Sequence, residues 1–167
     1  MPVRNPRELF VRVLSHARYG TERSAAIYRD LSDLAQNPDI QQALSARAFV
    51  ANQNVEKIDE AFRLIGEKPV SVSGRFLDVF LEDFRSELAD MQSPETRRLF
   101  VLAKANQLSQ MRAAEFSSLV AAADVTGHFG VGALLSSCLA DHLALIERTA
   151  RFVQSAVETK IAARATG

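Results

Sequence analysis

The sequence predicts an all-α protein, a ferritin-like four-helix bundle of two helical hairpins with a long crossover that carries a short extra helix. Four long segments repeat apolar residues at steps of three and four, which is the period of an amphipathic helix. The 7 glycines and 5 prolines cluster at the boundaries of these segments, and no segment alternates like a strand. The length of 167 residues fits a single domain, 1–167.

The first two segments form the first predicted hairpin. A helix is expected from about Pro6 to Ala35, with this inner stripe: Phe10, Leu14, Ala17, Thr21, Ala25, Tyr28, Leu31 and Ala35. Asn37 then supplies an N-cap, and Pro38 supplies the first position of the second helix. The inner stripe of that helix contains Leu44, Ala48, Ala51, Val55, Ile58, Phe62 and Ile65. Gly66 is expected to end it.

The crossover begins with a Val-Ser-Val-Ser-Gly linker at residues 70–74 and continues into a short amphipathic helix. One side of this helix is expected to carry Phe76, Phe80, Phe84 and Leu88. Such a stripe either forms a dimer surface or folds back on the bundle, and the sequence leaves both open.

The last two segments form the second hairpin. Ser93 and Pro94 open the third long helix, and Gly127 ends it. Its inner stripe contains Leu102, Asn106, Ser109, Ala113, Phe116, Val120 and Ala123. The fourth helix is expected from about Phe129 to near Ala162, with Leu135, Cys138, His142, Leu145, Thr149, Phe152 and Ala156 facing inward.

Composition excludes several classes of partner. Basic and acidic side chains number 20 each, so the net charge is zero, which argues against nucleic acid or an anionic membrane. No apolar run approaches the roughly 20 residues that cross a bilayer, and the polar N-terminus lacks the apolar core of a signal peptide. The single cysteine, Cys138, suits a reducing compartment. We therefore expect a cytoplasmic protein.

The chain resembles the YciE/YciF family of bacterial ferritin-like proteins over about Leu9 to Ala156. The segment Val55–Pro69 is similar to the family pattern V-E-R-L-E-x-x-F-x-x-L-G-E-K-P. Further matches are Leu9-Phe10, Pro38, Gly127-His128 and Leu134-Leu135. The resemblance implies a bundle interior with carboxylates on all four helices, a homodimer, and a stress-response context.

Most of the carboxylates that the resemblance implies are replaced in this chain. Those of the first three helices fall on Thr21, Phe49, Val50, Ser109 and Arg112. In the fourth helix only Asp141 and His142 remain as possible ligands. Hard metal pairs need several converging oxygen or imidazole ligands, so we expect no metal in the interior and no cofactor.

Two other interpretations of the interior remain open. A shifted iron, manganese or zinc site would use Glu22, Glu115, Asp141 and His142. Against it, His142 is interpreted as a core histidine that hydrogen-bonds to Ser109, Asn106 or Thr21, because two neighbouring helix residues do not easily chelate one ion.

Arg112 also has two interpretations. It either anchors a small anionic ligand in the interior, or forms an ion pair with Glu22 or Glu115 that ties helices together in place of a metal.

No catalytic constellation is present in the sequence. We find no Ser-His-Asp order, no His–Cys spacing and no glycine-rich phosphate loop. Cys138 is expected to fill the core, and His16 and His128 are expected at the surface. The sequence therefore predicts a non-enzymatic structural or binding protein.

Overall fold

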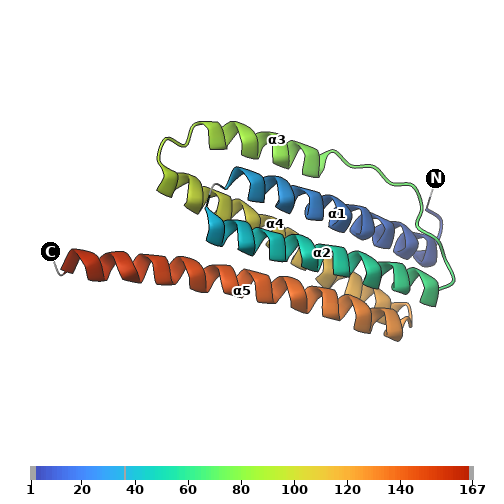
Figure 1. Cartoon of the computed structure of the whole chain (residues 1–167). Helices are drawn as coiled ribbons and strands as arrows, with labels where there is room; N and C mark the ends of the chain where they lie inside the picture. The colour runs from blue at the N-terminus through green and yellow to red at the C-terminus, as the bar shows by residue number, and fades with distance from the viewer. Residues whose placement is uncertain (1–2, 36, 166–167) are drawn as a thin grey trace.

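The computed structural model describes the backbone of residues 3–35 and 37–165 and the side chains up to residue 154. These residues form α1 (Pro6–Leu34), α2 (Pro38–Leu64), α3 (Phe76–Ala89), α4 (Pro94–Val125) and α5 (Phe129–Ala165), with no strand among them (Figure 1). The all-α prediction is confirmed. The inward position expected for Ala156 lies outside the described side chains.

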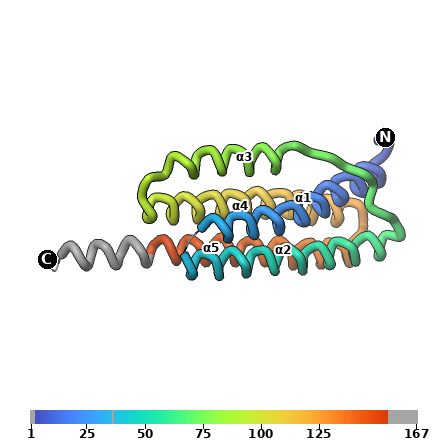
Figure 2. Tube along the Cα trace, turned by 45° about the horizontal axis from the view of Figure 1, so that its top comes forward, coloured from blue at the N-terminus to red at the C-terminus, as the bar shows by residue number. Residues whose placement is uncertain are grey.

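The helices are arranged as two hairpins joined by a long connection, as predicted. α1 packs against α2, and α4 packs against α5. The pairs α2–α5 and α1–α4 close the bundle. In Figure 2, α3 lies outside the four long helices, and its contacts are with α1 and α4.

Local sequence signals set the ends of the helices. The side chains of Asn37 and Ser93 accept hydrogen bonds from backbone amides three residues later, at 3.2 and 3.1 Å. Gly66 and Gly127 follow α2 and α4 with φ angles of 67° and 76°, a left-handed conformation that glycine adopts without strain. All four boundary predictions are confirmed.

The apolar core falls into two clusters, one toward each end of the bundle. Every residue of the predicted α1 stripe is buried. The α3 stripe is shifted: Phe76 is 65% exposed, and the buried face carries Leu77, Phe80, Phe84 and Leu88 instead. This face packs onto α1 and α4. The buried side of α3 therefore folds back on the bundle, which is the second of the two alternatives.

One helix of the described chain is more apolar than the sequence analysis expected. The part of α5 from Phe129 to Gln154 is long and apolar enough to cross a bilayer by length and composition alone, with a mean hydropathy of 1.6. The reason is that the outer face of α5 carries alanine, serine and leucine at many positions where a surface helix usually carries charges. A core helix of a soluble protein also meets this criterion, so the finding by itself is weak evidence for a membrane.

Candidate functional site

Each of the four long helices places at least one buried polar side chain near the middle of the bundle, and we single out one from each helix. These residues are Thr21, Asn54, Arg112 and His142, with exposed fractions of 1%, 0%, 6% and 1%. They come from α1, α2, α4 and α5 respectively. Apolar side chains of the two core clusters lie on either side of them along the bundle. We call this set the central polar layer.

Contacts between neighbouring helices put the four residues at one level. The cross-helix contacts are Arg112–Thr21 at 2.9 Å, Arg18–Asp59 at 2.6 Å and Lys57–Asp141 at 2.6 Å. Lys57 lies three residues from Asn54, and Asp141 precedes His142 directly, so Asn54 and His142 occupy the same stretch of the α2–α5 pair. Two of the four residues, Thr21 and Arg112, stand at positions where the resemblance implies a carboxylate, and His142 is one of the two possible ligands left in the fourth helix.

Arg112 ties α4 to α1 through neutral acceptors. Its Nη2 donates to the carbonyl of Ala17 at 2.8 Å and to Oγ1 of Thr21. A Cβ atom built on Gly20 would collide with this guanidinium, so the absence of a side chain there gives Arg112 its space.

The predicted ion pair of Arg112 is found with Glu115, and Glu22 does not take part. Because Arg112 and Glu115 are three residues apart on α4, this pair does not join two helices, contrary to the expectation. The tie between α4 and α1 comes from the hydrogen bonds to Ala17 and Thr21.

His142 is buried without the hydrogen bonds that the sequence analysis expected. Its ring stacks on Phe116, with centroids 5.4 Å apart. Neither ring nitrogen has a partner among the described residues, nor does either polar atom of the Asn54 side chain. The pKa of His142 is lowered to about 4, mainly by burial and then by the nearby charge of Arg112. The imidazole is therefore neutral at pH 7.

The expected hydroxyl partners of His142 are engaged elsewhere. Thr21 donates to the Ala17 carbonyl and accepts from Arg112, while Ser109 bonds to Tyr28 and Arg47. Buried polar groups without protein partners usually bind ordered water.

A second buried arginine lies further along the bundle, in α2. Arg47 is 4% exposed and donates to Oγ of Ser109 at 2.8 Å, to the carbonyl of Leu145 at 3.2 Å and to the hydroxyl of Thr149. The Tyr28 hydroxyl also contacts Ser109, at 2.9 Å. We call Tyr28, Arg47, Ser109 and Thr149 the Arg47 cluster.

Sequence reasoning missed Arg47 and Asn54 as interior residues. It placed Phe49 and Val50 at the α2 ligand positions, but Phe49 is 64% exposed and Val50 is only half-buried. The buried polar residues of α2 are Arg47 and Asn54. The helical period could have identified them, because residues 47, 51, 54 and 58 are spaced by four, three and four, which fits one helix face as closely as the predicted stripe does.

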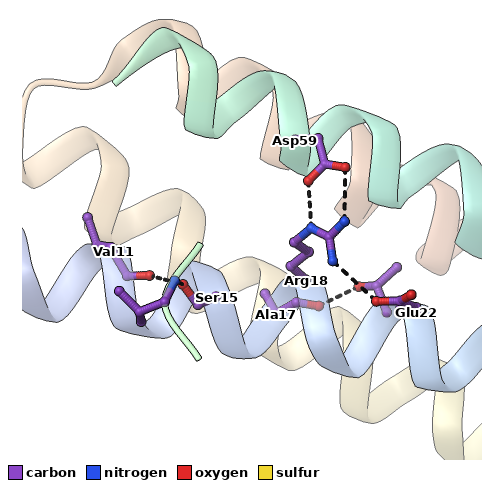
Figure 3. Close-up of polar contacts among 8 residues, drawn as sticks. Val11, Ser15, Ala17, Arg18, Glu22 and Asp59 are labelled. Carbon is purple, nitrogen blue, oxygen red and sulfur yellow. Dashed lines mark hydrogen bonds and ion pairs between the residues drawn. The ribbon is translucent and has the colours of Figure 1, made fainter. Parts of the chain in front are cut away.

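The four weak metal candidates are not brought together. Glu22 is exposed and pairs with Arg18, which also reaches Asp59 on α2 (Figure 3). Asp141 pairs with Lys57, and Glu115 pairs with Arg112, while His142 has no carboxylate partner. Throughout the described part of the chain, no group of three or more His, Cys, Asp or Glu side chains is placed to hold a metal ion.

The interior of the described bundle carries an excess of positive charge. Burial lowers the pKa of both Arg47 and Arg112, because a charged guanidinium is poorly solvated there. Glu115 is the carboxylate that pairs with one of them, and its side chain is 30% exposed. A cation entering the central polar layer would meet the guanidinium of Arg112 where a metal site needs carboxylates. The residues present do not fit a di-metal centre.

The remaining candidates are structural. Cys138 is fully buried, and burial raises the pKa of its thiol to about 12, so the expectation of a core filler is confirmed. His16 and His128 are half-buried, which is more burial than expected, and His128 stacks on Phe10 with centroids 5.5 Å apart.

Comparisons with solved structures find the same fold. The chain is similar to YcfI, a putative structural protein from Rhodopseudomonas palustris, with 18% identity and a TM-score of 0.82 over 88% of this chain and 94% of that one. It is similar to the E. coli stress protein YciF, with 17% identity and a TM-score of 0.85 over 93% and 99%. A protein from Xanthomonas campestris matches with 18% identity and a TM-score of 0.65 over 93% and 99%.

No curated protein matches the sequence at a significant level. A family model described as a domain of unknown function (DUF892) matches residues 5–165. This match covers nearly the whole chain and agrees with the motifs quoted above for the YciE/YciF family. The chain therefore belongs to the DUF892 family and is a YciE/YciF-like protein.

Proposed function

We propose that this protein is a ferritin-like structural or binding protein that works without a metal and catalyses no reaction. The observation that carries the proposal is the charge of its interior. In the central polar layer Arg112 stands with Thr21, Asn54 and a neutral His142, and the Arg47 cluster adds a second buried guanidinium. Such a set repels cations and offers too few ligands to bind one.

The proposed context is a stress response, in the cytoplasm. The stress context is supported by the similarity to YciF, a stress protein, at 17% identity, and the structural role by the similarity to YcfI, a putative structural protein, at 18% identity. Similarity at that level establishes a shared fold, so the role itself is transferred here as a proposal.

We also propose that the protein forms a homodimer. Large apolar side chains on α2 and α5 are exposed, namely Phe49, Leu64, Phe129 and Leu143. Large apolar side chains left exposed on two helices that pack against each other favour an interface between subunits. Sedimentation equilibrium should give twice the chain mass, and Leu143→Glu should lower it. A monomer at all concentrations would contradict the dimer.

Crystal soaks test the metal-free interior. Crystals soaked separately in ferrous iron, manganese and zinc should show no anomalous peak within the central polar layer. An ion held there by four or more protein atoms would overturn the proposal. Arg112→Glu is the matched variant, because it replaces the buried cation by a carboxylate at one position.

A further inference from the structure

A pocket of about 370 Å³ opens beside the Arg47 cluster. The helices α2, α4 and α5 form its walls, and α2 and α5 lie side by side in both views (Figures 1 and 2). Its volume is within the range of pockets that hold small organic ligands. None of the residues of the central polar layer lines it.

Two arginines line this pocket, and neither forms an ion pair with a carboxylate of the described residues. Arg47 lies at its base with neutral partners, namely two hydroxyl groups and a backbone carbonyl. Arg148 is exposed and has no ion pair with a described residue. The two charges are close enough for Arg148 to contribute to the lowered pKa of Arg47, after the larger effect of burial. An incoming anion would relieve both effects.

The other walls are mostly apolar. Ile40, Leu102 and Leu145 are buried side chains whose surfaces face the pocket, and the half-buried ring of Phe152 lines it as well. The guanidinium of Arg98 lies 5.3 Å from the centre of that ring, so a third cation lies next to this wall of the pocket. Asp39 also lines the pocket, so its walls carry two cations and one anion, and this net charge of +1 (2 − 1) suits a ligand with a single negative charge.

We propose that this pocket binds a monoanionic organic acid with an apolar body, such as a medium-chain carboxylate. The carboxylate pairs with Arg47 and Arg148, in the charge-assisted geometry that guanidinium groups favour. The apolar body packs against Ile40, Leu102 and Phe152. The inference gives the proposed binding role a ligand class, and it stands whether or not the interior holds a metal.

Calorimetric titration of the full chain with sodium octanoate tests the proposal, and octanamide serves as a neutral probe of the same length. Octanoate should bind saturably, with octanamide at least about tenfold weaker, because the amide lacks the charge that the arginines recognise. Ala46→Trp places a large ring in the pocket and should abolish binding. Arg148→Gln should weaken octanoate binding by about three- to tenfold.

The matched control is Arg151→Gln, which makes the same charge change three residues further along α5 at a residue that does not line the pocket. It should leave the octanoate affinity unchanged. The proposal is overturned if octanoate shows no saturable binding up to about 10 mM, if octanamide binds equally well, or if Ala46→Trp leaves binding intact in a variant that keeps its helical circular dichroism. Metal in the central polar layer would instead overturn the proposed function and leave this pocket standing.

Discussion

The two buried arginines lie in the same bundle but in different electrostatic surroundings. Arg112 has a carboxylate partner in Glu115, fills the space left by Gly20, and lines no part of the pocket described above. Arg47 has neutral partners and lines that pocket together with Arg148.

The charge of Arg112 is therefore structural, whereas the charge of Arg47 is available to bind a ligand. Removing one member of a buried ion pair leaves the other charge unpaired in surroundings that solvate it poorly, and this lowers the stability of the fold. Removing a buried charge that has no counter-ion relieves a desolvation penalty and costs little. Arg112 should therefore matter for stability, and Arg47 for recognition.

The largest expected effect is the contrast between Arg112→Leu and Arg47→Leu. Arg112→Leu should lower the free energy of unfolding by about 3 kcal/mol, at the low end for a broken buried pair because Glu115 is 30% exposed. Arg47→Leu should change it by less than about 1 kcal/mol in either direction. Urea unfolding followed by circular dichroism measures both. If Arg47→Leu lowers the free energy of unfolding more than Arg112→Leu does, the assignment of the structural role to Arg112 is wrong.

The next effect concerns His142, whose pKa is lowered by burial and then more by Arg112 than by Arg47. Its folded pKa of about 4 lies below the unfolded value of 6.5, so the unfolded state binds the proton first as pH falls. The histidine therefore costs no stability above pH 6.5 and increasingly destabilises the fold as pH falls toward 4.

The variant His142→Leu isolates that contribution from the carboxylates that also titrate in this range. Between pH 7 and about pH 4.5, the wild type should lose about 2 kcal/mol more unfolding free energy than the variant. Equal pH dependence in the two proteins would mean that His142 is not held neutral by its surroundings.

Gly20→Ala should have a smaller effect, acting only on the Arg112 side of the comparison. The added methyl group displaces the guanidinium, and we expect a loss of about 1–2 kcal/mol, typical of overpacking. Gly130→Ala is the control, since a Cβ there meets only a Leu64 methyl group at 3.7 Å and should leave stability unchanged or raise it by up to about 1 kcal/mol. Equal effects at the two glycines, read from thermal unfolding, would show that Arg112 can move freely.

The smallest effect is expected for Arg18, a partly exposed arginine that has two carboxylate partners, Asp59 and Glu22. A double-mutant cycle with Arg18→Ala and Asp59→Ala should give a coupling energy below about 1 kcal/mol, because water already solvates both groups. A coupling energy larger than the loss caused by Arg112→Leu would show that the burial of an arginine does not determine how much its ion pair contributes to stability.

The sequence was sufficient for features that depend on local signals. The inner face of α1 follows from a regular period, and the ends of α2 and α4 follow from Asn37, Ser93, Gly66 and Gly127. Each of these signals acts within a few residues, so no distant contact had to be known.

The sequence was insufficient where burial depends on distant partners. Arg47 is buried because Ser109, Leu145 and Thr149 accept its hydrogen bonds from 62, 98 and 102 residues away. A charged side chain is expected in solvent unless such partners exist, so α2 was assigned an apolar stripe without it. The register of the short helix α3 was likewise set by contacts with α1 and α4, which bury Leu77 and leave Phe76 outside.

The measurement that tests the cationic interior most directly is elemental analysis by mass spectrometry of the untagged protein, after reconstitution with iron, manganese and zinc. Two buried guanidinium groups and the scattered carboxylates predict less than about a tenth of a metal ion per chain. One or two tightly held ions per chain would contradict the account and would reopen an enzymatic function for the central polar layer.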